Sequence, residues 1–261
     1  MASRSSIPVD RLPAWRRALR YDLARTVLGF ILRCYLRPRA SGLERLPNGP
    51  YVLCFNHLSW IDPFVLMVLW PRRPRLYVYG PKEADMRVGA RNQVISWLGT
   101  AVPFNPGKTN LLESTRRAVA VLAAGHALGI AGEGGLSDQE GVVLRLNDGA
   151  AYFGLRAAVP IVPAGIVGSR WLRFGKPIQV TVGEPLSTEG LRADRETVNA
   201  LTERLQQALP ALLPGPYEHE PPGAFGRFVT DVFTEARGAG RGAVVPGTMD
   251  TASEPSEDAK T

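Results

Sequence analysis

Short apolar runs of strand-forming residues alternate along this chain with longer stretches that have helical periodicity. The apolar runs occupy 51–55, 75–79, 100–104, 127–131, 160–167 and 178–182, and the helical patterns occupy 13–36, 63–70, 92–98, 111–124, 147–157, 197–209 and 225–236. This alternation is typical of strand-helix-strand units with parallel strands. It therefore predicts an α/β fold with a largely parallel central sheet flanked by helices.

The same pattern divides the chain into four segments. Residues 1–41 are expected to form an N-terminal basic amphipathic helix, and residues 42–213 the α/β domain. Residues 214–238 combine a proline-rich linker with another amphipathic helix, and residues 239–261 have the composition of a disordered tail. No uncharged apolar run reaches the roughly 18 residues of a membrane-spanning helix. We therefore expect peripheral contact with the cytoplasmic side of a membrane.

The N-terminal helix carries an apolar stripe whose partner the sequence leaves open. Its members recur at helical spacing: Leu19, Leu23, Val27, Phe30 and Ile31. A basic helix of this kind can lie in a lipid interface, but the same stripe could dock on the protein core. The chain has 31 Lys and Arg against 24 Asp and Glu, which suits an anionic partner such as a membrane surface. No nucleic-acid recognition motif is present, so nucleic acid is not an expected partner.

The two cysteines, Cys34 and Cys54, have no paired or metal-ligand spacing. They predict neither a disulfide framework nor a zinc site. We expect both to be small hydrophobic residues, and their use fits a reducing compartment.

A histidine and an aspartate flank one strand-to-helix loop. The apolar run 51–55 leads to His57, and Asp62 directly precedes Pro63 at a predicted helix start, where Asp is a favoured cap. A loop that brings imidazole and carboxylate together would make a general base. The alternative is a buried histidine bonded to backbone, with Asp62 acting only as a cap.

Four short blocks occur in a fixed order. They are Asn56-His57-Leu58-Ser59-Trp60-Ile61-Asp62, Gly99-Thr100-Ala101-Val102-Pro103-Phe104-Asn105, Gly132-Glu133-Gly134-Gly135 and Val159-Pro160-Ile161-Val162-Pro163. Over about residues 42–185, this order resembles the PlsC-like glycerolipid acyltransferase family, also called lysophospholipid acyltransferases. The resemblance implies phospholipid biosynthesis, with acyl transfer from a thioester on coenzyme A or acyl carrier protein to a lysolipid hydroxyl.

The resemblance also implies roles for individual residues. His57 would be the general base, oriented by Asp62, and no metal or cofactor would be needed. Backbone N–H groups near the His57 loop are candidate oxyanion donors. The substrate-binding candidates are Glu133, Gly134, Asn105 and Lys108, and the acyl-pocket candidates are Pro160, Ile161 and Val162.

Two of the blocks depart from the family pattern. Asn105 stands where the second block usually ends in arginine, with Lys108 three residues on. The third block usually reads Pro-Glu-Gly-Thr-Arg, and here Gly132, Gly135 and Leu136 replace the proline, threonine and arginine. The loss of two phosphate-binding cations favours another lysolipid, alcohol or amine as acceptor.

Two other functions compete with acyl transfer. An inactive homologue that binds lipid at the membrane surface is the main alternative, because the cationic handles are missing. A serine hydrolase is disfavoured, since no G-x-S-x-G elbow surrounds Ser59.

Overall fold

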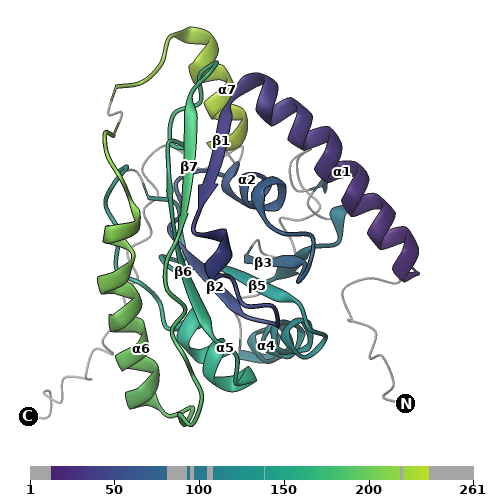
Figure 1. Cartoon of the computed structure of the whole chain (residues 1–261), viewed down its shortest axis with the longest axis vertical. Helices are drawn as coiled ribbons and strands as arrows, with labels where there is room; N and C mark the ends of the chain where they lie inside the picture. The colour runs from purple at the N-terminus through teal and green to yellow at the C-terminus, as the bar shows by residue number, and fades with distance from the viewer. Residues whose placement is uncertain are drawn as a thin grey trace, which may run out of the picture.

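A seven-stranded sheet forms the centre of the protein (Figure 1). The computed structural model describes residues 13–80, 93–94, 97–104, 108–137, 139–217 and 220–234. The strands are β1 (Arg37–Ser41), β2 (Val52–Phe55), β3 (Leu76–Gly80), β4 (Ala101–Pro103), β5 (Ala127–Ala131), β6 (Ile161–Val167) and β7 (Pro177–Val182). Their order is β1-β7-β6-β2-β5-β3-β4, and every neighbouring pair is parallel except β6 with β7. The predicted α/β fold with a largely parallel sheet is confirmed.

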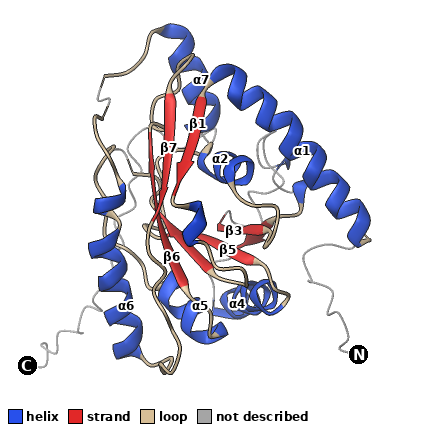
Figure 2. Cartoon of the chain, in the orientation of Figure 1, coloured by secondary structure: helices blue, strands red, loops and turns tan. Residues whose placement is uncertain are grey.

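Helices cover both faces of this sheet (Figure 2). One core contains side chains of α1 (Ala14–Tyr35) and α2 (Asp62–Leu69). The other contains side chains of α4 (Lys108–Ala123), α5 (Gly149–Ala157) and α6 (Arg195–Ala208). Side chains alternate along β2, so Leu53 and Phe55 join the first core, while Val52 and Cys54 join the second. Burial on both faces explains why β2 is an uninterrupted apolar run.

Strand β1 was absent from the sequence prediction, which assigned residues 1–41 to the N-terminal helical segment. The helix ends at Tyr35, and Arg37–Ser41 pairs in register with β7 at the edge of the sheet. This strand reads Arg-Pro-Arg-Ala-Ser and has no fully buried position, so it carries no apolar signal. An edge strand also tolerates Pro38, which would disfavour a central strand.

Helix α1 is apolar on two opposite sides. Tyr21, Ala24 and Leu32 are buried in the core. The stripe identified in the sequence faces away from the core and is exposed: Leu19, Leu23, Val27, Phe30 and Ile31, together with Trp15. The stripe is therefore not the surface by which α1 docks on the domain.

The C-terminal part contains a short 3₁₀ helix (Pro210–Leu212) and helix α7 (Ala224–Thr234), close to the predicted 225–236. A second 3₁₀ helix, Leu43–Arg45, follows β1. Of the predicted helix 92–98, only 93–94 and 97–98 are described, and the predicted tail at 239–261 lies outside the described residues. Within the described ranges, no helix is long and apolar enough to cross a bilayer.

The two cysteines should differ sharply in reactivity. Cys34 is exposed on α1, whereas Cys54 is buried in β2. Burial, with a smaller contribution from the Glu133 charge, raises the pKa of the Cys54 thiol to about 12, so it stays protonated at pH 8. We expect a thiol reagent at pH 8 to modify Cys34 in the native protein and Cys54 only after unfolding. Rapid native modification of both would contradict this packing.

Candidate active site

The loops that follow β2 and β5 lie side by side, because these two strands are neighbours in the sheet. Phe55 at the end of β2 is level with Ala131 at the end of β5. The chain leaves β2 toward β3 on one side, and leaves β5 toward β6 on the other. Open α/β sheets bind ligands outside the carboxyl ends of strands where the strand order reverses in this way. His57 and Glu133, each two residues beyond these paired strand ends, lie at that position.

His57 and Asp62 form a buried pair. Nδ1 of His57 lies 2.9 Å from Oδ2 of Asp62, and the Asp62 side chain is fully buried. The rings of Phe55 and Trp60 approach the imidazole edge-on, with ring centroids 6.1 and 5.9 Å away. A carboxylate at Nδ1 favours the tautomer with the proton on that nitrogen, which leaves Nε2 to accept a proton. The proposed proximity of the two side chains is thus present in the structure.

Asp62 does not cap α2, contrary to the prediction. The preceding residue, Ile61, is the N-cap, and no side chain makes a capping bond there. Instead, Asp62 Oδ2 accepts hydrogen bonds from the backbone N–H groups of Leu58 and Ser59 at 2.9 and 3.0 Å. The loop curls around the carboxylate, so Asp62 holds the loop and the imidazole and does not cap the helix.

These bonds also revise the expected oxyanion donors. The N–H groups of Leu58 and Ser59 bind Asp62, and that of His57 donates to Glu133 Oε2 at 2.9 Å. All three donors are therefore occupied by carboxylates, and they are not available to a developing oxyanion.

Glu133 ties the two loops together. Its Oε2 accepts the His57 N–H, and its Oε1 accepts the Leu144 N–H at 2.8 Å. Burial raises the pKa of the Glu133 carboxyl, and the two N–H donors oppose that rise. Glu133 was expected as a substrate-binding residue, and in the structure its carboxylate orients the backbone of His57 and Leu144.

Replacing Glu133 by glutamine should loosen this connection. Glutamine offers one acceptor oxygen in place of two, so one N–H would face an amide donor. We expect a loss of about 1–3 kcal/mol in unfolding free energy, and a fall in kcat on the order of 10-fold from misplacement of His57. Urea unfolding and acyl-transfer kinetics would measure both.

Glu113→Gln is the matched control, because Glu113 is an exposed residue of α4 that pairs with Arg117 one helical turn away. Wild-type kcat and stability in Glu133→Gln would contradict the positioning role.

Asn56 is a structural residue that the sequence reading missed. Its amide donates to the Ile166 carbonyl at 2.9 Å and accepts the Ile166 N–H at 2.7 Å. The pair of bonds anchors the residue before His57 to β6. The signal in the sequence was a polar residue directly after an apolar strand. Such a residue is buried here, and buried polar groups are almost always hydrogen-bonded.

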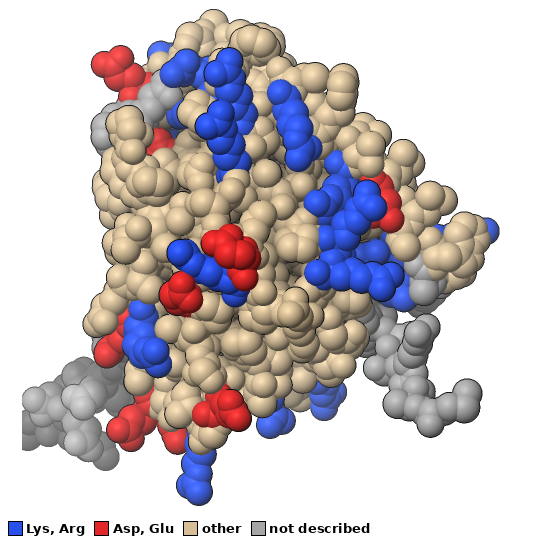
Figure 3. Space-filling view, in the orientation of Figure 1, with Lys and Arg blue, Asp and Glu red and all other residues tan. Residues whose placement is uncertain are grey.

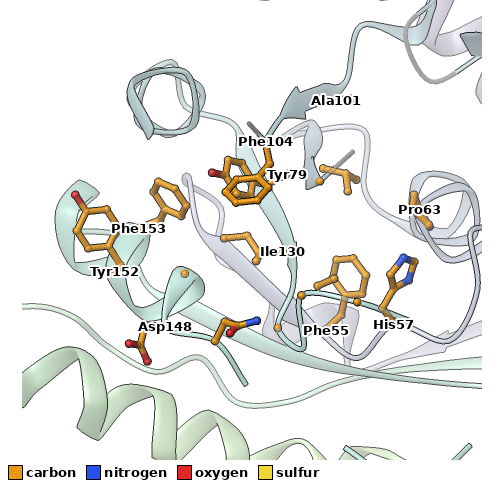
Figure 4. Close-up of a pocket in the computed structure, with 18 of the residues that line it drawn as sticks. Phe55, His57, Pro63, Tyr79, Ala101, Phe104, Ile130, Asp148, Tyr152 and Phe153 are labelled. Carbon is orange, nitrogen blue, oxygen red and sulfur yellow. The ribbon is translucent and has the colours of Figure 1, made fainter. Parts of the chain in front are cut away.

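A large apolar cavity opens beside His57 (Figure 4). Its volume is about 1120 Å³, above the roughly 300–1,000 Å³ of common small-molecule pockets. His57 and Phe55 lie on one side, while Tyr152, Phe153 and Asp148 lie on the opposite side. Apolar side chains from separate elements line it: Phe64 and Met67 of α2, Leu76 and Val78 of β3, Ile130 of β5 and Phe153 of α5. This lining suits a hydrocarbon chain.

Of the predicted substrate-binding residues, Gly134 lines this cavity, and Glu133 is not part of its wall. Gly134 lines it together with Gly135 and Leu136, so an apolar side chain stands where the family pattern has arginine. Asn105 lies outside the described residues, as does the side chain of Lys108.

Gly132, which replaces the family's proline, packs closely against two side chains, which would have to shift to admit a larger residue. A Cβ there would lie 2.8 Å from Leu146 Cδ2 and 2.9 Å from Cys54 Sγ. The close packing of Leu146 and Cys54 thus favours glycine at this position.

The acyl-pocket candidates do not line the cavity. Ile161 and Val162 are fully buried in β6, where strand alternation sends them into the two opposite cores. Pro160 directly precedes this strand and is also absent from the cavity wall. An apolar run is equally typical of a central strand, and in this protein it forms the core.

The described residues offer no obvious place for a metal. Among them, no group of three or more His, Cys, Asp or Glu side chains is arranged to hold an ion. What the site does present is an imidazole with one nitrogen bound to a carboxylate, at the wall of an apolar cavity. Such a group can remove a proton from a hydroxyl held near a fatty chain.

Residues 37–167, half of the chain, match the family model described as Acyltransferase. The chain belongs to the acyltransferase family. The matched residues of this acyltransferase include His57, Asp62 and Glu133, and both loops of the site.

The fold of this acyltransferase is also that of a solved structure. The 1-acyl-sn-glycerophosphate (LPA) acyltransferase PlsC from Thermotoga maritima aligns with a TM-score of 0.58 and 17% sequence identity. The alignment covers 76% of this chain and 81% of that chain. The PlsC-like resemblance inferred from the four blocks is therefore confirmed at the level of family and fold.

Proposed function

We propose that this acyltransferase moves a fatty acyl group from a thioester, on coenzyme A or acyl carrier protein, to the hydroxyl of a lysophospholipid or related glycerolipid. One observation carries the proposal: the His57–Asp62 pair, 2.9 Å apart, stands at the wall of a large apolar cavity. The cavity supplies space for the acyl chain, and the pair supplies a base. The family match supports the reaction class.

The proposed reaction takes place in one transfer without an acyl-enzyme. Nε2 of His57 removes the proton of the acceptor hydroxyl while its oxygen attacks the thioester carbonyl carbon. The tetrahedral intermediate then expels the thiolate, which takes the proton back from the imidazolium. Asp62 stabilises that imidazolium. The only other reactant is the acyl thioester, and the scheme uses no cofactor or metal.

The acceptor that we favour is a glycerolipid without the terminal phosphate monoester that lysophosphatidate carries. Leu136 lines the cavity where the family pattern has arginine, and Arg195 is the one Lys or Arg among the described lining residues. Asp148 and Asp194 also line it, so that wall has no net positive charge. A lysolipid with a diester head group, or another alcohol, fits such a wall better. The Thermotoga protein is named for lysophosphatidate, which is therefore the reference acceptor.

We further propose that the enzyme works peripherally on an anionic membrane surface, where its lipid acceptor resides. The outward apolar stripe of α1 supports this, because it is exposed and accompanied by arginines such as Arg16 and Arg20. Vesicle cosedimentation should be strong at low salt and weaker at high salt. Absence of binding at low salt would count against the membrane contact, but not against acyl transfer.

The reaction can be tested directly. The purified full chain is incubated with labelled acyl-CoA, or with acyl carrier protein thioester, and with lysophosphatidate, lysophosphatidylglycerol, lysophosphatidylethanolamine or monoacylglycerol. We expect a diacyl product, with at least one diester or neutral acceptor preferred to lysophosphatidate. If no acceptor is acylated from either donor while lipid vesicles still bind, the chain is a lipid-binding module and the enzymatic proposal fails.

A further inference from the structure

Two helices from opposite ends of the chain present apolar faces outward. On α1, six large apolar side chains are between 48% and 71% exposed. On α7, Phe225, Phe228 and Val232 are between 52% and 67% exposed, while Thr230 of the same helix is buried and Val229 packs against the core. Both helices are thus held to the domain by one side and leave a second apolar side uncovered.

These two faces meet at one aromatic junction. The Tyr35 ring, at the C-terminal end of α1, lies 6.1 Å from the ring of Phe225 on α7. It lies at the same distance from the ring of Phe174, which is 75% exposed in the loop before β7. Figure 1 shows α7 beside that end of α1. The exposed side chains of α1, Phe174 and α7 therefore form a continuous strip, called here the α1–α7 surface.

Arginines are concentrated in the segments that build this surface. Residues 13–39, 170–176 and 224–234 contain ten arginines but only two acidic residues, Asp22 and Asp231. On the face drawn in Figure 3, basic side chains gather over α1 and over the end of the molecule where β1 and α7 lie. An apolar strip with a cationic surround is complementary to a bilayer that carries anionic head groups.

We propose that the α1–α7 surface as a whole docks on an anionic bilayer, with α7 and Phe174 forming a second contact beside α1. This inference rests on the membrane contact proposed for α1 and extends it to the C-terminal helix. A single interfacial helix leaves the domain free to roll about the helix axis. Two helices joined at an angle define a plane, and they fix which side of the domain faces the lipid.

The charge distribution favours lipid over the other possible occupants. A symmetric pairing of two copies through this surface would bring its arginines against one another, which is unfavourable. The chain beyond α7, residues 235–261, contains no Leu, Ile, Phe, Trp or Tyr and could not cover so many large apolar side chains.

The test places one reporter dye at a time on the full chain. Cys34 on α1 is exposed and can be labelled as it stands, since Cys54 is buried. A second protein, Cys34→Ser with Val232→Cys, carries the dye on the outward face of α7. A third, Cys34→Ser with Leu191→Cys, is the control, because Leu191 is an exposed apolar residue in the loop that precedes α6.

With phosphatidylglycerol vesicles, we expect the fluorescence emission of dyes at positions 34 and 232 to shift to shorter wavelength. Lipids that carry a quencher on their acyl chains should reduce this emission. The dye at position 191 should not respond. The triple variant Phe225→Ser, Phe228→Ser, Val232→Ser should bind these vesicles at least about 10-fold more weakly. Leu112→Ser with Val142→Ser, at two exposed sites elsewhere, should bind as wild type does.

Each result decides a different point. A response at position 34 without one at position 232 overturns the role of α7 and leaves the α1 contact standing. No response at either position overturns both membrane proposals, and acyl transfer to lysolipid in detergent would still be measurable. Blue shifts without quenching by labelled lipid, together with dimers in sedimentation velocity, would identify a second copy of the chain as the occupant.

Discussion

Replacing His57 by alanine should lower the rate of acyl transfer on the order of 100-fold or more. The substitution removes the proton acceptor from the cavity wall, and a positioned general base contributes roughly that factor. Little change in folding is expected, because Asp62 keeps its bonds from the Leu58 and Ser59 N–H groups. The fall should appear in kcat at saturating thioester, since the apolar cavity is otherwise intact.

His126 provides a matched control for this experiment. Its ring packs against Tyr77 in a tilted arrangement, with ring centroids 5.2 Å apart. It directly precedes β5 and does not line the cavity. Burial, with smaller contributions from the nearby Arg75 and Arg17 charges, lowers the pKa of His126. His126→Ala should retain acyl transfer close to wild type. Equal rates for wild type and His57→Ala would remove His57 from the mechanism.

Substitutions of Asp62 should separate activity from stability. All three donors to its carboxylate, the His57 ring and the Leu58 and Ser59 N–H groups, meet at Oδ2. In Asp62→Asn the amide oxygen can take that position, so the loop and the histidine tautomer should persist. What is lost is the negative charge that stabilises the imidazolium, and we expect kcat to fall about 10- to 100-fold.

Asp62→Ala should be more severe, because it leaves the buried Leu58 and Ser59 N–H groups without an acceptor. We expect an additional loss of about 2–5 kcal/mol in unfolding free energy. Urea unfolding and steady-state kinetics on both variants would test this order. If alanine and asparagine are equally destabilising, the backbone bonds to Asp62 contribute little to the fold. If Asp62→Asn keeps full activity, the carboxylate charge has no part in catalysis.

The histidine–aspartate pair could be predicted because it is local. Its members are five positions apart in one strand-to-helix loop. The apolar run 51–55 predicted the strand before this loop, and Pro63 predicted the start of the helix after it. The contact of Glu133 with the His57 N–H joins residues 76 apart in sequence. It depends on β5 lying next to β2, and hydrophobic periodicity does not specify strand order. The four-block resemblance indicated Glu133 as a site residue, but not the atoms that it binds.

The acyl-pocket candidates lie away from the cavity for a related reason. Residues 160–162 are apolar, and burial between two helical layers demands the same composition as contact with a fatty chain. The cavity wall is instead assembled from α2, β3, β5 and α5, whose contributions are scattered along the sequence. The orientation of α1 was undetermined from sequence because a helix that is apolar on two sides gives no preference for either.

The double attachment of Glu133 constrains how this enzyme can be altered. The turn at 132–135 and the backbone of His57 are bound to one carboxylate, so a shift of the turn cannot leave the imidazole where it was. Substitutions at residues 134–136 that are meant to admit a new head group will therefore change kcat as well as acceptor selectivity. Libraries at those positions should be screened for both properties together.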